Sequence, residues 1–217
     1  MTYIDELFSP QHSIAWEYIS SFSKLHEMLP GIHDFILSYP KSGFAEIADG
    51  VWVSPDAVIA PSALIQPPCI IDSGAEIRHS AFIRGNTVIG KNCVIGNSVE
   101  IKNTIISDSA EVPHFNYVGD SILGYKAHMG AGSITSNIRS DKEPIVMHFN
   151  DMDVETGMIK IGAFLGDRAE IGCNAVLNPG TVIGHDSIVY PLSSVRGFIP
   201  SWMIFKGSGT IQRQHKE

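Results

Sequence analysis

Residues 57–98 read AVIAPS ALIQPP CIIDSG AEIRHS AFIRGN TVIGKN CVIGNS, seven blocks with an aliphatic residue third in each. Every sixth position from Ile47 to Ile101 is Ile or Val. A helix needs apolar recurrence near 3.6 residues, which a period of six does not supply. The period suits a short strand and a tight corner, so that three blocks close one triangular coil and the next stacks about 4.8 Å away. The stretch therefore predicts an all-β chain built as a parallel β-helix.

The repeat continues beyond this stretch with irregularities. It slips by one residue after Ile101, needs further adjustments up to Ile134, and resumes from Ile159 to Val195. The intervening segment, 138–158, breaks the repeat and is rich in charge. A long excursion from a rigid solenoid is usually functional or disordered.

The start of the chain has a different period. Apolar residues at helical spacing are Trp16, Ile19, Phe22, Leu25 and Leu29. Pro30 and Gly31 end this pattern, and a second short helix is expected before Pro40. We therefore expect a helical N-terminal cap over 1–45 that covers the open end of the solenoid, with binding of a partner as the alternative role. A β-helix over 46–200 and a C-terminal tail over 201–217 are expected to follow.

Composition excludes several classes of partner. With 15 Lys and Arg against 23 Asp and Glu, the formal charge of -8 disfavours binding to the phosphate backbone of nucleic acid. No apolar run approaches the roughly 20 residues of a membrane span, and the first residues lack the basic and apolar parts of a signal peptide. The 3 cysteines stand singly, which is typical of a reduced setting. We expect a cytoplasmic protein without nucleic-acid or membrane partners.

Between Arg84 and Asn137 the chain resembles a known family, the acetyltransferase domain of the bifunctional N-acetylglucosamine-1-phosphate uridylyltransferase and glucosamine-1-phosphate acetyltransferase. The stretches that carry the resemblance are FIRGN (82–86), VEIKN (99–103), HFNYVGDSILG (114–124) and MGAGSITSN (129–137). The resemblance implies that the β-helix is left-handed and that the chain is a hexapeptide-repeat acyltransferase. It also implies a homotrimer with each active site between neighbouring solenoids.

The same resemblance assigns a catalytic histidine. His114 matches the family's general base. The chemistry agrees, because an amine must lose a proton as it attacks a thioester, and imidazole titrates in the right range to accept it. Ala131 matches the position where the family's backbone approaches the acetyl group of acetyl-CoA, the expected acyl donor.

Other matches concern the acceptor. Arg84 and Lys102 match contacts to the sugar phosphate, and a guanidinium beside a lysine suits a phosphate dianion. Tyr117 and Asn137 match residues that hold the amino sugar, while Glu100 matches a carboxylate near the base. These matches imply an acetyl-CoA-dependent N-acetyltransferase acting on an amino sugar phosphate such as glucosamine 1-phosphate.

One substrate-binding position departs from the family pattern. His128 stands where the family has an asparagine in the acceptor site, and Asn137 is followed by IRSDK in place of the familiar sequence. The acceptor can therefore differ from glucosamine 1-phosphate.

Two other functions occur or can be imagined for a solenoid of this kind. A γ-type carbonic anhydrase needs three histidines around a metal, and the chain lacks the expected HxxxxH pair among His79, His114, His128, His148 and His185, so no metal is expected. A non-catalytic solenoid that acts as a partner or regulatory subunit of a sugar nucleotidyltransferase stays open, because a fold does not specify a function.

Overall fold

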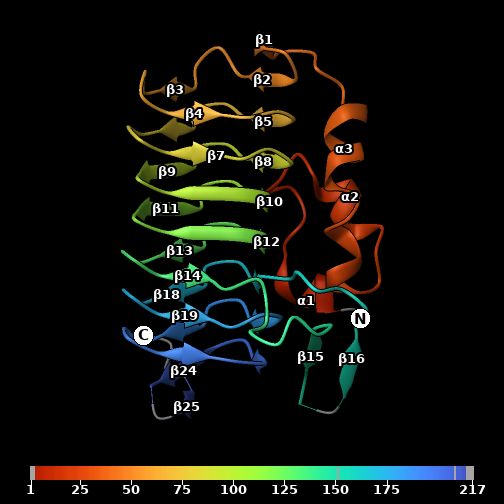
Figure 1. The fold of residues 1–217 in the computed structure, drawn as a ribbon, viewed down its shortest axis with the longest axis vertical. Helices are drawn as coiled ribbons and strands as arrows, with labels where there is room; N and C mark the ends of the chain where they lie inside the picture. The colour runs from red at the N-terminus through yellow and green to blue at the C-terminus, as the bar shows by residue number, and fades with distance from the viewer. Residues whose placement is uncertain (1–2, 151, 208, 214–217) are drawn as a thin grey trace.

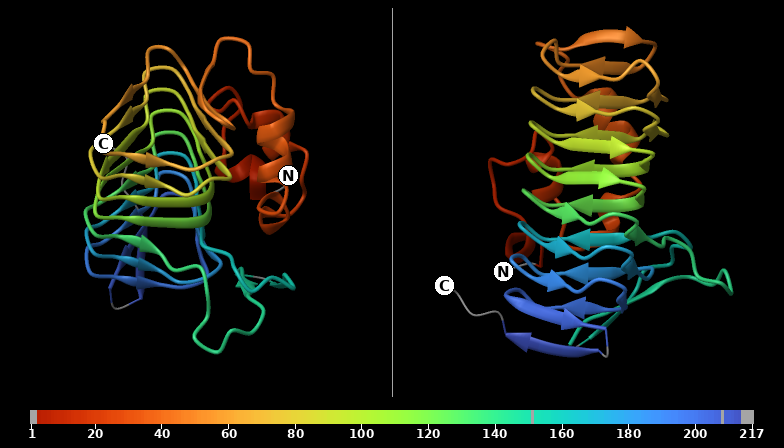
Figure 2. Two further views of the ribbon diagram at one scale, coloured as in Figure 1. Left: turned by 45° about the horizontal axis from the view of Figure 1, so that its top comes forward. Right: turned by 90° about the vertical axis from the view of Figure 1, so that its left-hand side faces the viewer.

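The computed structural model describes residues 3–150, 152–207 and 209–213, and its main body is a left-handed parallel β-helix. The coils stack along the long axis of the molecule (Figure 1) and have a roughly triangular outline when seen obliquely from one end (Figure 2). Side chains at the sixfold positions, such as Ile71, Ile83 and Ile95, are fully buried inside the coils. The fold class predicted from the repeat is confirmed.

Three faces make up each coil. The first face is a 9-stranded sheet in the described part of the chain, made of β3 (Val58–Ile59), β6 (Glu76–Ile77), β9 (Val94–Asn97), β11 (Glu111–His114), β13 (His128–Met129), β18 (Glu170–Ile171), β21 (Ile188–Val189), β24 (Met203–Lys206) and β25 (Thr210–Arg213). Since β24 pairs in parallel with β21, the described start of the expected tail continues the β-helix.

A larger sheet, 14-stranded within the described residues, wraps around the other two faces because two long strands bend at a corner. The second face contains β4 (Leu64–Ile65), β7 (Phe82–Ile83), the first parts of β10 (Glu100–Ile106) and β12 (Tyr117–Leu123), β14 (Ile134–Thr135), β19 (Val176–Leu177) and β22 (Ser194–Val195). The third face contains β1 (Ala45–Ala48), β2 (Val51–Val53), β5 (Cys69–Ile71), β8 (Thr87–Ile89), the last parts of β10 and β12, β17 (Ala163–Leu165), β20 (Thr181–Ile183) and β23 (Phe198–Ile199).

The N-terminal helices lie along the flank of the solenoid (Figure 1). They do not cover its open end, which is where the sequence analysis expects them. They are α1 (Tyr3–Leu7), α2 (Trp16–Ser20), the 3-10 helix η1 (Leu25–Met28) and α3 (Ile32–Ser38). The reason is the apolar outer surface of the third face, whose exposure to water would be costly. Helical residues and this surface form one buried cluster, which on the solenoid side includes Ile70, Val88, Ile105, Ile122, Phe164 and Val182.

The corner between the second and third faces is shaped by amides and a carboxylate. Asn86, Asn103 and Asp120 follow one another at intervals of 17 residues, and each has a φ of 49°. Asn and Asp adopt this left-handed conformation more readily than other residues with side chains. Asn137 is the next residue in this series, and there the chain leaves the solenoid.

The excursion expected over 138–158 has its own structure. It contains an antiparallel hairpin of β15 (Val146–His148) and β16 (Asp153–Glu155). Ile145 and Met147 are buried in the cluster that the helices form with the third face. The rings of Phe149 and Tyr3 lie 4.4 Å apart. The excursion is thus tied to the helical segment, beside which it lies in Figure 1.

Three expected core positions are wrong. Ile47 is 56% exposed, because β1 pairs antiparallel with β2 and is not part of a regular parallel coil. Ile134 points outward, and Thr135 takes the inner position beside Leu177. The Thr135 hydroxyl is acceptable there because it accepts a hydrogen bond from the Gly119 N–H at 3.0 Å. Ile159 is 50% exposed, since it still belongs to the returning excursion, and Leu165 is the first residue of the resumed sixfold series that is buried inside the coils.

Candidate active site at a corner of the β-helix

A polar cluster lies on the second face, where neighbouring coils place the predicted substrate-binding residues side by side. Glu100 pairs in register with Tyr117, and Lys102 with Gly119. Arg84 lies one coil earlier, directly after β7. Alternation along each strand sends these side chains outward while the aliphatic residues between them fill the interior. The structure therefore brings Arg84, Glu100, Lys102 and Tyr117 together.

Both cations of this cluster face carboxylates. Arg84 Nη1 lies 2.7 Å from Glu100 Oε1, and Lys102 Nζ lies 3.7 Å from Asp120 Oδ2. Asp120 is 5% exposed and was not among the residues predicted from the sequence. Two signals point to it: its place at the end of HFNYVGD, and the 17-residue series of corner residues.

Asp120 connects the cluster to Asn137. Asn137 Nδ2 donates to Asp120 Oδ2 at 2.6 Å and to Tyr117 Oη at 3.1 Å, while Asn103 Nδ2 donates to Asp120 Oδ1 at 2.9 Å. Burial, followed by the charges of Asp120 and Glu100, raises the pKa of the Tyr117 hydroxyl. This hydroxyl therefore stays protonated near neutral pH and can donate a hydrogen bond to a ligand.

His114 lies at the neighbouring corner, between the first and second faces. It is the last residue of β11, its side chain is exposed, and the imidazole has no hydrogen-bond partner among the described residues. The backbone beneath it is firmly held: Asn116 Oδ1 accepts from the His114 N–H at 3.0 Å, and Asn116 Nδ2 donates to the Gly130 carbonyl at 2.8 Å. An exposed imidazole on a rigid corner can take a proton from a bound ligand.

Ala131 is on the coil next to His114. Its neighbour Gly132 donates from its N–H to the His114 carbonyl at 3.0 Å. A Cβ on Gly132 would come within 2.2 Å of the Asn174 side chain, and its φ is +72°. Glycine adopts this φ without strain and leaves space for the Asn174 side chain, so packing alone is enough to explain Gly132 in the GAG stretch.

His128 is not part of the second-face cluster. It projects from the first face, where Nδ1 lies 2.9 Å from Glu170 Oε2. Its strand partner on the preceding coil is Glu111. The hydrogen bond to Glu170 raises the pKa of His128 and so favours the charged imidazolium. Within one chain, His128 and Tyr117 therefore lie on different faces.

In the part of the chain that the structure describes, no three His, Cys, Asp or Glu side chains gather closely enough to hold a metal ion. No helix in that part is long and apolar enough to cross a bilayer.

Replacing Asp120 with asparagine is expected to weaken the cluster without changing its shape. Asparagine tolerates the left-handed backbone, but its amide cannot accept from both Asn103 and Asn137, so one buried donor loses its partner at a cost of about 1–3 kcal/mol. If the chain has the N-acetyltransferase activity that the resemblance implies, the expected result is a higher KM for the acceptor with a smaller change in kcat, measured by steady-state kinetics. Asp56→Asn, at an exposed corner, is the matched control. An unchanged KM would show that Asp120 does not position the acceptor site.

The architecture and the corner site define a hexapeptide-repeat protein of the left-handed β-helix class. The chain belongs to the family described as the GMPPB C-terminal domain, whose model matches residues 65–188.

Curated relatives include acetyltransferases. The bifunctional sugar-1-phosphate nucleotidylyltransferase/acetyltransferase of Sulfurisphaera tokodaii is 33% identical over 92 residues, which are 42% of this chain and 23% of that protein. The bifunctional protein GlmU of Methanococcus vannielii is 39% identical over 90 residues, 42% of this chain and 22% of that protein. The alignment thus spans less than a quarter of either relative. The resemblance inferred from the motifs is confirmed.

Matches among solved structures include a variant of GDP-perosamine N-acetyl transferase from Caulobacter crescentus. That chain is 20% identical, with a TM-score of 0.34 over 76% of this chain and 57% of the other. A variant of AntD, an N-acyltransferase from Bacillus cereus, is 17% identical, with a TM-score of 0.33 over 80% of this chain and 91% of the other.

Proposed function

We propose that this protein is an acetyl-CoA-dependent N-acetyltransferase whose acceptor is an amino sugar phosphate such as glucosamine 1-phosphate. The observation that carries the proposal is the position of His114, an exposed imidazole between the polar cluster of the second face and the Ala131 backbone on the next coil. The acetyltransferase names of the curated relatives support it. The isolated positions of the three cysteines in the sequence support a cytoplasmic location for the reaction.

The arrangement suggests how the reaction proceeds. Arg84 and Lys102 hold the acceptor phosphate, and Tyr117 and Asn137 bind hydroxyl groups of the sugar. His114 removes a proton from the amine as its nitrogen attacks the thioester carbonyl. Backbone N–H groups near Ala131 donate hydrogen bonds to the oxyanion of the tetrahedral intermediate. The C–N bond forms, the C–S bond breaks, and the proton on His114 passes to the departing thiolate of CoA.

A homotrimer would bring the first face of one chain to the second face of its neighbour and so place His128 near the acceptor. Exposed apolar side chains support such contact at the corner between these faces: Phe115 is 63% and Leu192 is 79% exposed. Light scattering after gel filtration should report three times the mass of the 23.6 kDa chain. The mass of a single chain at micromolar concentration would contradict the proposal.

A second candidate is a non-catalytic solenoid partner or regulatory subunit of a sugar nucleotidyltransferase. The pairing of Arg84 and Lys102 with carboxylates favours it, because less positive charge is then free for a phosphate. Thiol release from acetyl-CoA, measured with a panel of amino sugar 1-phosphates, separates the two candidates. Release that depends on the acceptor supports acetyl transfer, whereas no release with any acceptor favours the non-catalytic partner.

A further inference from the structure

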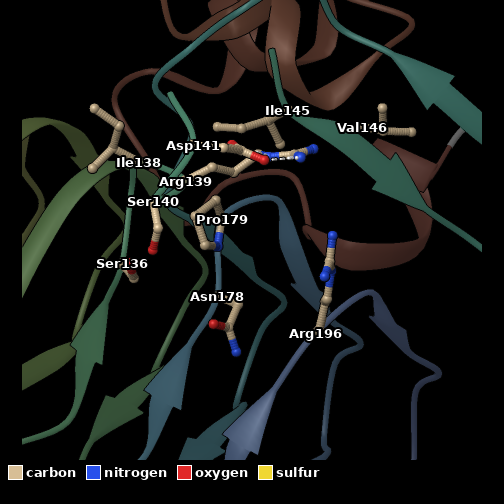
Figure 3. Close-up of a pocket in the computed structure, with 10 residues that line it drawn as sticks. All are labelled: Ser136, Ile138, Arg139, Ser140, Asp141, Ile145, Val146, Asn178, Pro179 and Arg196. Carbon is tan, nitrogen blue, oxygen red and sulfur yellow. Dashed lines mark hydrogen bonds and ion pairs between the residues drawn. The ribbon is translucent and has the colours of Figure 1, made fainter. Parts of the chain in front are cut away.

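We propose that the pocket between the excursion and the second face binds a nucleoside phosphate, and that Arg196 holds its phosphate. The pocket has a volume of about 340 Å³ and is formed by Ser136, Asn178 and Arg196 on the solenoid side and by Ile138, Ser140 and Val146 on the excursion (Figure 3). This proposal deepens the proposed function, on which it rests, because it assigns a place to a second part of a substrate.

The first argument is the unpaired charge of Arg196. Its side chain extends from the end of β22 towards the excursion (Figure 3), it is exposed, and it has no ion-pair or hydrogen-bond partner within the described residues. The other guanidinium of the pocket, on Arg139, is held by Asp141 through two hydrogen bonds of 2.9 and 2.6 Å. Arg196 is therefore the cation of this pocket that is free to bind an anion, and a guanidinium binds phosphate through paired hydrogen bonds.

The second argument is the position of the pocket on the face that carries the polar cluster. Lys102 pairs with Gly119, and the strand registers continue through Ser136 and Asn178 to Arg196. Four coil steps of about 4.8 Å place Arg196 about 19 Å from Lys102 along the solenoid axis. A substrate bound at the cluster can therefore extend along the same face into the pocket.

The third argument is the chemistry of the walls. Ile138, Val146 and Pro179 offer apolar surface, while Ser136 and Asn178 offer polar groups beside the guanidinium. A nucleoside phosphate combines these needs, because its base buries apolar area, its ribose accepts and donates hydrogen bonds, and its phosphate carries the charge. The volume lies within the usual range for small-molecule sites, about 300–1,000 Å³. Such a group occurs both in a nucleotide-linked amino sugar and in CoA.

The test is equilibrium binding measured by calorimetry, with uridine, guanosine and thymidine diphosphate and CoA as separate probes. Arg196→Gln is expected to weaken binding of at least one probe by about tenfold or more, the value of a lost charge-assisted hydrogen bond. Ser140→Phe, which fills the pocket without changing its charge, should weaken the same probe. Arg78→Gln is the matched control, because it removes a half-buried guanidinium from the first face, where it pairs with Glu76 at 3.0 Å.

The outcomes separate the two sources of the nucleotide. Weakened binding of a nucleoside diphosphate assigns the pocket to the acceptor, and weakened binding of CoA alone assigns it to the donor; either result supports the proposal. No binding of any probe to the parent protein, or equal binding by the parent and Arg196→Gln, overturns it. Binding is measured without turnover, so the two proposals can fail separately. If the parent protein releases no thiol but Arg196→Gln still binds a probe more weakly than the parent, the pocket assignment stands and only the acetyltransferase proposal is rejected.

Discussion

Replacing His114 with alanine is expected to lower kcat for acetyl transfer by about 10²- to 10⁴-fold, the usual contribution of a positioned general base. The amine of the acceptor would then have to lose its proton to water during attack on the thioester. Stability should change little, because the imidazole is exposed and the corner is held by Asn116 and by backbone hydrogen bonds. The measurement is acceptor-dependent thiol release, with thermal unfolding of the same preparation.

His79→Ala provides the control for this experiment. His79 is also exposed on the first face, two coils before His114, and its ring is hydrogen-bonded to Asn97 at 2.8 Å. Its removal deletes an imidazole of the same kind without touching the proposed base. Added imidazole should partly restore activity to His114→Ala, because the exposed corner leaves room for it. Full activity in His114→Ala would remove this residue from the mechanism.

Replacing Phe164 with alanine is expected to lower the free energy of unfolding by about 3–5 kcal/mol, as is usual for a buried Phe. Phe164 has the largest fully buried side chain among the described residues. It lies on the third face between Ile122 and Val182. The N-terminal helices pack over this surface, so the substitution opens a cavity between the helices and the solenoid. Urea unfolding followed by circular dichroism measures the loss.

Leu37→Ala is the matched control, because Leu37 of α3 is 54% exposed and lies away from the proposed contact between chains, so its truncation should change stability by no more than about 0.5 kcal/mol. A loss for Phe164→Ala as small as that of the control would contradict the docking of the helices. Limited proteolysis adds a second readout: the parent should resist cleavage within residues 3–38, whereas Phe164→Ala should be cut there sooner.

Most of the fold was predictable because a sixfold repeat constrains every coil in the same way. Ile71, Ile83 and Ile95 lie where the repeat places them. The repeat fails at Ile47, where β1 pairs antiparallel with β2 at the end of the solenoid. It also fails at Ile134 and Ile159, on either side of the excursion, because there the next coil is interrupted and local hydrogen bonding decides which side chain points inward.

The candidate site was predictable in part. The motifs bring Arg84, Glu100, Lys102 and Tyr117 into one cluster because these residues occupy equivalent positions on adjacent coils. Asp120 was not among the predicted residues although it ends the HFNYVGD motif, because its importance comes from accepting hydrogen bonds from residues 17 positions away on either side. Nor did the motifs show that His128 projects from another face.

Periodicity along the chain established the β-helix, its inner residues and the order of its coils, because each inner position repeats the same local requirement for an aliphatic side chain. Three-dimensional packing decided where the helices dock, how the excursion is anchored and which cations are already paired. These features depend on contacts between segments far apart in the chain, such as Phe149 with Tyr3 or Phe164 with the N-terminal helices. Such contacts leave no period in the sequence, since each is made once.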